Sequence, residues 1–258
     1  MHLKLYSWNV NGLRATSGKA GFRDWFTGSR ADYIAFQETK AAPEQLGGEL
    51  LNPEAYLSYW SAPRTRRGYS GVVTYSRNAP RSEAYELPQP AYSEEGRLVL
   101  LEDPAFYFFN VYFPNGQQGA ARLKYKLEYY EAFLDYAQTL RKKKPVVVCG
   151  DFNTAHRPVD LARPRENEGF SGFLPIEREW LDKFTAAGYV DTYRLLNGPE
   201  AVGYTWWSLR TGARARNVGW RLDYFFVSSE LKEAVKRAWI EPEVMGSDHC
   251  PVGLELSV

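Results

Sequence analysis

The stretch that decides the fold is Val146-Val147-Val148-Cys149-Gly150-Asp151-Phe152-Asn153. The β-branched residues after Pro145 favour a strand inside a sheet, whereas the side chains of Asp151 and Asn153 are costly to bury without partners. Gly150 lets the backbone turn or approach a ligand closely. We read the run as a strand ending in a candidate site, and taken alone it also fits a strand followed by an Asx-stabilised turn.

The composition is that of a globular protein in water. The chain has 258 residues, 44% hydrophobic and 24% charged, and no linker rich in glycine, serine or proline divides it, so we predict a single domain over residues 1–258. No apolar run is long enough to span a bilayer, and Leu3 to Trp8 reads as a strand and not as a signal segment, which favours the cytoplasm. Cys149 and Cys250 are too few for a disulfide framework, and we expect both to be reduced.

The alternation of apolar runs and turns predicts strands and helices in two repeated sets. Strands are expected over 3–8, 33–36, 55–61, 71–76, within 98–112 on either side of Asp103-Pro104, within 217–227 and over 252–256. Helices are expected over 22–27, 121–140 and 176–187, and a long polar loop over 156–172. This order indicates the α/β class, or α+β by some schemes, with two packed mixed β-sheets flanked by helices.

Polar side chains recur at the ends of the expected strands. Because loops converge at strand ends in α/β sheets, a single cleft lined by these residues is the simplest hypothesis. The residues are Asn9, Asn11, Glu38, Tyr112, Asn115, Asp151, Asn153, Asp223, Asp248 and His249.

These residue types suit phosphodiester chemistry with a metal ion. Glu38, Asn11 and Asp248 offer the hard oxygen ligands that Mg²⁺ prefers. Asp223 could orient and charge the imidazole of His249. Asp151 and Asn153 could hold a water. Tyr112 and Asn115 could donate hydrogen bonds to a phosphate. The set indicates metal-assisted hydrolysis of a phosphodiester.

A basic loop is a candidate nucleic-acid contact. The net charge of +1 gives the whole chain no attraction for a polyanion, so binding would need a local patch. Arg64, Arg66 and Arg67 beside Tyr69 suit a DNA backbone, and a solvated hairpin tip is the alternative.

Three alternatives carry less weight. A non-catalytic nucleic-acid binder would not need four carboxylates that repel phosphate, which are Glu38, Asp151, Asp223 and Asp248. Nucleophilic catalysis by a serine is disfavoured because no Gly-x-Ser-x-Gly elbow occurs, and Ser247 fits a turn. A metal site at His156 is the third alternative, but this histidine has no partner at metal-site spacing and is expected at the surface.

The order of the motifs resembles the exonuclease III family of abasic-site endonucleases. The resemblance covers nearly the whole chain and implies a four-layer α/β sandwich, shared with pancreatic-type deoxyribonuclease, sphingomyelinase and inositol-phosphate phosphatases. Another phosphohydrolase of that broader group, such as a nonspecific nuclease, is the second reading. The motifs are Trp8-Asn9-Val10-Asn11-Gly12-Leu13-Arg14, Gln37-Glu38-Thr39-Lys40, Gly68-Tyr69-Ser70-Gly71-Val72, Tyr112-Phe113-Pro114-Asn115, Gly150-Asp151-Phe152-Asn153, Gly219-Trp220-Arg221-Leu222-Asp223-Tyr224 and Ser247-Asp248-His249.

The resemblance also implies roles at the metal site. Glu38 would be the principal ligand of Mg²⁺, for which Mn²⁺ could substitute, with Asn11 and Asp248 nearby and Asn9 in support. Some members carry aspartate in place of Asn11, and the amide weakens the case for a second tightly held cation. Gln118 stands where some relatives have an arginine that inserts into the duplex, which implies weaker retention of product.

The same resemblance assigns the reacting groups. Asp223 would pair with His249, while Asp151 and Asn153 would position the attacking water. Tyr112, Asn115 and His249 would bind the phosphate. Whether Asp151 or His249 accepts the proton of the water stays open.

The implied substrate is duplex DNA, which would be cleaved on the 5′ side of an abasic site to leave a 3′-hydroxyl and a 5′-deoxyribose phosphate. The enzyme is expected to be a monomer. Removal of 3′ blocking groups and 3′-to-5′ exonuclease action are expected second activities. Trp206, Trp220 and Leu222, close to Asp223 in the sequence, would form an apolar pocket for the bare sugar. The alternative is that these indoles belong to the core.

Overall fold

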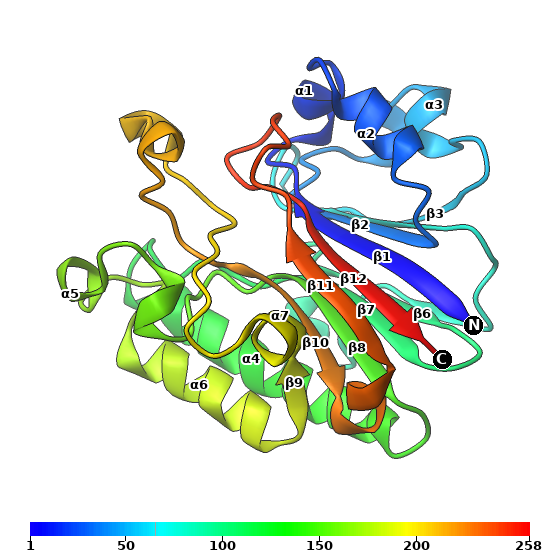
Figure 1. Ribbon diagram of the computed structural model, residues 1–258. Coiled ribbons are helices and arrows are strands. Elements are labelled where there is room, and N and C mark those ends of the chain that lie inside the picture. Colours follow the sequence, from blue (N-terminus) through cyan, green and yellow to red (C-terminus); the bar gives the residue numbers. More distant parts are fainter. Residues whose placement is uncertain (65) are drawn as a thin grey trace.

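The computed structural model describes residues 1–64 and 66–258, so that Thr65 of the basic loop lies outside the described residues. It contains two six-stranded mixed sheets (Figure 1). The first has the order β11 (Val235–Ile240), β12 (Val252–Ser257), β1 (His2–Asn9), β2 (Tyr33–Gln37), β4 (Val72–Ser76) and β3 (Leu57–Ser61). The second has the order β5 (Glu83–Ala84), β6 (Leu98–Glu102), β7 (Tyr107–Tyr112), β8 (Val146–Asp151), β10 (Asp223–Ser228) and β9 (Tyr189–Asp191).

Helices cover the outer faces of both sheets (Figure 1). The first sheet carries α1 (Leu13–Ser17), α2 (Phe22–Gly28) and α3 (Gly48–Leu51), and the second carries α4 (Ala120–Arg141) and α6 (Pro175–Ala186). Two short helices, α5 (Pro164–Asn167) and α7 (Thr192–Asn197), lie in the connections on either side of α6 and β9. The predicted α/β sandwich of two packed mixed sheets flanked by helices is confirmed.

Alternating side chains of the strands fill three apolar layers. In β1, Leu3 and Leu5 point into the core between the sheets, whereas Tyr6 and Trp8 pack under α1 and α2. Both faces of the central strands are therefore buried, which explains why their sequences read as nearly continuous apolar runs. A polar side chain can reach solvent only where such a strand ends.

Strand pairing brings the polar strand ends together. In the second sheet, Asp151 at the end of β8 lies opposite Tyr112 of the parallel strand β7 and opposite Asp223 of the antiparallel strand β10. In the first sheet, β1 and β2 run parallel, so Asn9 lies beside Gln37 and next to Glu38. A one-residue slip in register would turn each of these side chains to the other face of its sheet.

The two long helices form for local reasons that the sequence carries. In α4, Tyr130, Phe133 and Ala137 are buried at helical spacing against the second sheet. In α6, Pro175 occupies the first turn and Glu177 accepts a hydrogen bond from the backbone N–H of Leu174, which caps the helix start. None of the helices in the described part of the chain is both long and apolar enough to cross a membrane.

The structure also differs from the expectations in detail. The strand expected within 217–227 spans Asp223–Ser228, and the polar loop expected over 156–172 contains a 3₁₀ turn at Pro158–Asp160 and the helix α5. The elements not expected from the sequence are the strands β5, β9 and β11 and the short helices α1, α3, α5 and α7. They are short or weakly patterned segments that form through pairing and capping by other elements, for example Asp191, whose side chain accepts from the N–H of Tyr193 in α7.

His156 is buried, so its predicted surface position is wrong. Its side chain is 5% exposed, and its Nε2 lies 2.8 Å from Asp182 Oδ1 on α6. The backbone carbonyl of His156 accepts a hydrogen bond from Arg178, and its backbone N–H donates to the hydroxyl of Tyr224. Contacts with a helix that follows in the sequence bury this loop residue, and no local pattern reveals them.

The burial of His156 predicts a pH-dependent contribution to stability. Burial lowers the pKa of His156 below its ordinary value of 6.5, despite the opposing influence of Asp182. Below that ordinary value the unfolded chain binds the proton more readily than the folded protein, so acid favours unfolding. We expect the difference in unfolding free energy between the wild type and His156→Gln to shrink as the pH falls from neutral to mildly acidic, measured by denaturant titration. A difference that does not change with pH would contradict this assignment.

Candidate active site

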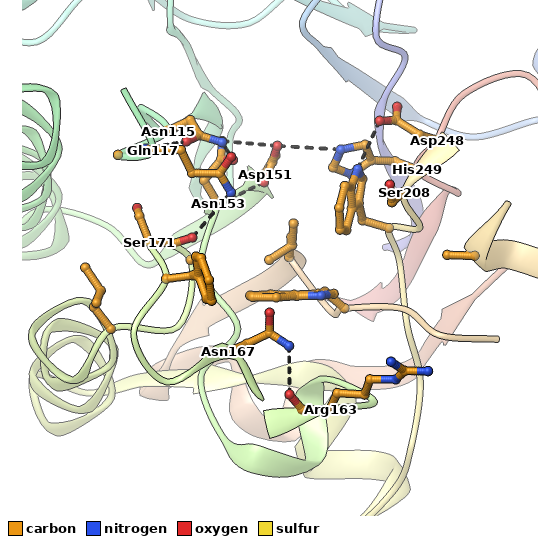
Figure 2. Close-up of a pocket in the computed structure, with 18 of the residues that line it drawn as sticks. Asn115, Gln117, Asp151, Asn153, Arg163, Asn167, Ser171, Ser208, Asp248 and His249 are labelled. Atoms are coloured by element: carbon orange, nitrogen blue, oxygen red, sulfur yellow. Dashed lines mark hydrogen bonds and ion pairs between the residues drawn. The ribbon is translucent and has the colours of Figure 1, made fainter. Parts of the chain in front are cut away.

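The polar strand ends open into one large cleft of about 960 Å³. Figure 2 shows Asn115, Asn153, Asp151 and His249 along one side and Asn167 with Arg163 on another. Asn9 and Asp223 are buried and do not line the cleft. The predicted site residues that line it are Asn11, Glu38, Tyr112, Asn115, Asp151, Asn153, Trp206, Trp220, Leu222, Asp248 and His249.

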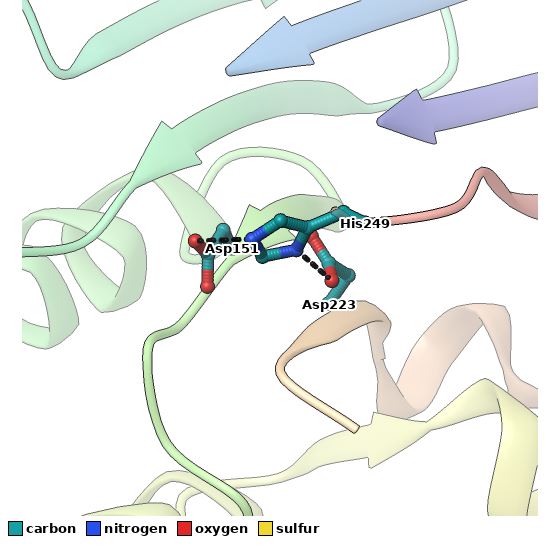
Figure 3. Close-up of side chains that lie close together, drawn as sticks. All are labelled: Asp151, Asp223 and His249. Carbon is teal, nitrogen blue, oxygen red and sulfur yellow. Dashed lines mark hydrogen bonds and ion pairs between the residues drawn. The ribbon is translucent and has the colours of Figure 1, made fainter. Parts of the chain in front are cut away.

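At the base of the cleft an imidazole lies between two carboxylates (Figure 3). His249 Nδ1 is 2.8 Å from Asp223 Oδ2, and His249 Nε2 is 3.9 Å from Asp151 Oδ2. All three side chains are buried, and Asp223 Oδ1 has no hydrogen-bond partner among the described residues. Asp223 therefore fixes the orientation of the ring and directs Nε2 toward Asp151 and the cleft.

The electrostatics of this group follow from burial and from mutual charge. Burial first, and then the neighbouring Asp223, raise the pKa of Asp151 to about 7. Burial opposes protonation of His249, but the charges of Asp223, Asp151 and Asp248 outweigh it and raise the pKa of His249 to about 10. The neighbouring carboxylates thus favour the protonated imidazole, which lies beside a carboxylate made more basic than usual by its burial.

Asp151 is held by a short turn that follows β8. Its Oδ1 accepts from the N–H of Asn153 at 2.7 Å, and its Oδ2 accepts from Asn9 Nδ2 at 2.9 Å. Asn153 adopts a left-handed backbone with φ of 52° and donates through Nδ2 to the carbonyl of Phe113 at 2.9 Å. Its Oδ1 accepts from Asn115 at 3.1 Å. The two amides thus form a chain from β7 to Asp151.

Tyr112 brings a phenol to the same edge. Burial and the charge of Glu38 raise its pKa well above the ordinary value, so that the hydroxyl remains a proton donor. Arg97 fixes this residue by donating to its backbone carbonyl at 2.9 Å and by lying 4.7 Å from the ring centre. Tyr112 lines the cleft, and a protonated phenol can donate to an anion there.

The expected metal ligands lie together on the side of the first sheet. Asn11 donates to Asp248 Oδ1 at 2.8 Å, and Asn9 donates to Glu38 Oε2 at 3.2 Å. The ammonium of Lys40 lies 3.0 Å from Glu38 Oε1 and also donates to the side-chain oxygen of Asn11. A cationic group thus already bridges these oxygens. The donor set of two carboxylates and an amide oxygen fits a hard divalent cation.

The imidazole and its two carboxylates are a second group of side chains close enough together to hold a metal ion. One ligand atom from each of Asp151, Asp223 and His249 lies within 4.8 Å of the others. In this arrangement His249 Nδ1 is bonded to Asp223, and a protonated imidazole has no lone pair to offer a metal ion, so this group is the poorer metal site.

The residues predicted to form an apolar pocket line one wall of the cleft. Trp206 and Trp220 are partly exposed, lie edge to face with ring centres 6.3 Å apart, and pair through reciprocal backbone hydrogen bonds. Leu222 packs with them in the same apolar cluster. Trp206 also donates to Asp248 Oδ2 at 2.9 Å, which ties this wall to the expected metal site. The neighbouring Trp207 is buried and lies outside the cleft lining.

The basic loop is not part of the cleft lining. Arg64 pairs with Glu86 at 2.8 Å, and Arg66 stacks over Tyr69 at 4.6 Å. The hydroxyl of Tyr69 accepts from Arg97, the same residue that holds Tyr112. Arg64, Arg66 and Arg67 are exposed, and their contact with a DNA backbone stays a prediction.

Sequence reasoning missed several residues that hold the site. Thr205 Oγ1 accepts from the backbone N–H groups of Leu222 and Asp223, which places the start of β10. Lys126 and Glu177 form a buried ion pair beneath the turn after β8. The available signal was a lysine at the spacing of the apolar stripe in α4, four residues before Tyr130.

The chain is similar to known nucleases over nearly its whole length. The model of the endonuclease/exonuclease/phosphatase family matches residues 6–249, a range that includes every predicted site residue. An exodeoxyribonuclease of Bacillus subtilis (strain 168) is 43% identical over 256 residues, covering 99% of this chain and 100% of that protein. The DNA repair nuclease APEX1 of Danio rerio is 39% identical, covering 100% of this chain and 83% of that protein. The crystal structure of the AP endonuclease LMAP from Leishmania major has a TM-score of 0.89 at 28% identity, covering 100% of this chain and 88% of that chain.

Proposed function

The chain belongs to the endonuclease/exonuclease/phosphatase family and is a nuclease, and we propose that it is a Mg²⁺-dependent DNA-repair phosphodiesterase that cleaves duplex DNA on the 5′ side of abasic sites. The observation that carries the proposal is that the hydrolytic groups and the apolar wall share one cleft, joined by the hydrogen bond from Trp206 to Asp248. A site that only hydrolyses phosphodiesters would not need an indole wall beside its carboxylates.

Glu38, Asp248 and Asn11 would hold the metal ion. Bound Mg²⁺, or Mn²⁺ in its place, would neutralise phosphate charge and act as a Lewis acid. Two features of the chain favour this site over the one at His249: its oxygens already attract the ammonium of Lys40, and it leaves the imidazole free for the phosphate.

The reacting groups fall into two sets in this proposal, one for the water and one for the phosphate. Asp151 and Asn153 hold the attacking water, and the raised pKa of Asp151 makes its carboxylate a competent proton acceptor near neutral pH. The His249 imidazolium, the Tyr112 phenol and the amide of Asn115 donate to the phosphate oxygens and balance the charge that grows on them. Asp223 keeps His249 charged and oriented.

The apolar wall supports selection of abasic sites. An enzyme that acts on one nucleotide within a duplex must swing it out of the stack, and a nucleotide without a base is the cheapest to extrude. Trp206, Trp220 and Leu222 would receive the bare sugar and leave no room for a base. Removal of 3′ blocking groups and 3′-to-5′ exonuclease action would use the same groups, and similarity to a bacterial exodeoxyribonuclease supports them. The monomeric state, the single domain and the cytoplasmic location stay predictions from the sequence.

The direct test compares two duplexes of one sequence, with and without a single abasic-site analogue. We expect faster Mg²⁺-dependent cleavage of the abasic duplex, with the cut on its 5′ side. Glu38→Ala should lower the rate roughly a hundredfold or more at ordinary Mg²⁺, because it removes a ligand of the metal. The control is Glu44→Ala, an exposed carboxylate outside the cleft, which should behave as wild type. Near-normal turnover of Glu38→Ala would contradict the metal assignment. Equal cleavage of both duplexes would contradict the preference for abasic sites.

A double-mutant cycle tests whether Asp223 and His249 act as one unit. Either replacement destroys the same 2.8 Å contact between the two side chains. We therefore expect nearly the same loss of activity in Asp223→Asn, in His249→Gln and in the double variant. Binding of abasic DNA should persist in all three, as measured by fluorescence anisotropy. Additive losses would mean that the two side chains contribute independently.

The sugar pocket is tested by replacing Trp220, with a replacement of Trp207 as the control. Trp220→Ala should slow cleavage at abasic sites and reduce the preference over undamaged DNA, because the wider pocket admits a base. Trp207→Ala is the matched control, since Trp207 is buried outside the cleft and should lose thermal stability while keeping the preference. If Trp220→Ala also loses only thermal stability, Trp220 is a core residue and the pocket assignment fails.

A further inference from the structure

We propose that the buried ion pair of Lys126 and Glu177 is a positioning unit that couples the catalytic turn after β8 to the wall of the cleft that faces Trp220. The inference rests on the proposed function, because it concerns how the groups that activate the water are held in position relative to the groups that select the sugar. Lys126 lies in α4 and Glu177 in the first turn of α6, and both side chains are completely buried.

On one side the pair supports the turn that carries the catalytic amide. The ammonium of Lys126 donates to the backbone carbonyl of Asn153 at 2.8 Å, to Thr154 Oγ1 at 2.8 Å and to Glu177 Oε1 at 2.6 Å. These three bonds use its three hydrogens. Because Asn153 has a left-handed backbone, an external partner for its carbonyl helps to hold the turn in that conformation.

On the other side the pair supports the cleft wall at residues 171–174. Glu177 Oε1 also accepts from Ser171 Oγ at 2.7 Å, and Glu177 Oε2 accepts from the backbone N–H groups of Gly172 at 2.6 Å and Leu174 at 3.1 Å. Ser171, Gly172 and Leu174 all line the cleft. One carboxylate thus anchors this wall while its partner ammonium anchors the catalytic turn.

The two anchored segments meet each other at Gly172. A Cβ at this glycine would lie 3.3 Å from the ring of Trp220 and 3.4 Å from the carbonyl oxygen of Asn153, the oxygen that Lys126 binds. The backbone carbonyl of Gly172 also accepts from the N–H of Ala155 at 2.8 Å. A shift of the wall would therefore move the indole face and the catalytic turn together.

A buried ion pair is in general a poor source of stability. Replacing a buried pair by apolar side chains of similar size is often neutral or stabilising, whereas removing one partner leaves a buried charge unpaired. Every hydrogen-bonding group of this pair is used, and its bonds end on two segments that line the cleft. The arrangement accordingly serves the geometry of the site.

The test uses three variants of the full chain. Lys126→Met removes the bonds to the turn and leaves Glu177 unpaired. Lys126→Met combined with Glu177→Gln removes both charges, while the glutamine can still accept from Gly172 and Leu174. Leu134→Ala, buried two turns along α4 with an apolar side chain, is the control for destabilisation alone. Each is measured for kcat and KM on abasic and undamaged duplexes, for thermal stability, and for amide hydrogen exchange at residues 151–155 and 171–174.

The expected result separates stability from catalysis. The double variant should recover thermal stability relative to Lys126→Met but keep a kcat about tenfold to a hundredfold below wild type with little change in KM, since a displacement of the reacting groups of about 1 Å has that effect. Exchange should be faster at residues 151–155 in both variants, and at residues 171–174 chiefly in Lys126→Met. In Lys126→Met the preference for abasic DNA should also fall. Leu134→Ala should lose stability with kcat and preference unchanged.

Other outcomes overturn one proposal without the other. If kcat in the double variant returns with stability, or if exchange at residues 151–155 is unchanged, the pair is structural only and the positioning role fails. If the wild type shows no preference for abasic DNA, the proposed function fails, and the positioning role is then decided by kcat on the undamaged duplex together with the exchange data.

Discussion

Two carboxylates facing each other across neighbouring strands are the constraint on which the rest of the site depends. The register of β8 and β10 sets Asp151 opposite Asp223 in a buried place, where like charges repel strongly. His249, from a loop at the edge of the other sheet, brings the positive charge that makes the arrangement stable. The packing of the two sheets is thus needed to assemble a group that neither sheet contains alone.

Carboxylates outside this group are also compensated by a neighbouring positive charge. Two further anions near the cleft have a cation in contact, since Lys40 lies on Glu38 and Lys126 on Glu177. The three cationic partners differ in burial: Lys126 is enclosed, His249 lines the cleft and Lys40 is partly exposed. In the proposed function this gradient corresponds to three roles, which are support of the turn by Lys126, contact with the substrate by His249 and exchange of Lys40 with a metal ion.

Strand ends could be predicted from the sequence because burial on both faces of a strand leaves a local pattern. The runs before Asp151 and Glu38 show it clearly, and the structure places both side chains in the cleft. Partners supplied by distant segments leave no such pattern. His156 reads as a surface residue until Asp182 of α6 covers it, and Lys126 reads as an ordinary helix residue until Glu177 reaches it. Tertiary contacts decide the environment of such residues.

The pairing of β1 with β12 also has a consequence for rearranging the chain. Residues His2 and Ser257 are partners in the sheet, so the two ends lie side by side (Figure 1), while Asn9 at the other end of β1 lies at the cleft. Seven steps along a strand span roughly 23 Å. A fused tag or domain would therefore attach far from the cleft, and a short linker between the ends would allow a circular permutant with its new termini in an exposed loop.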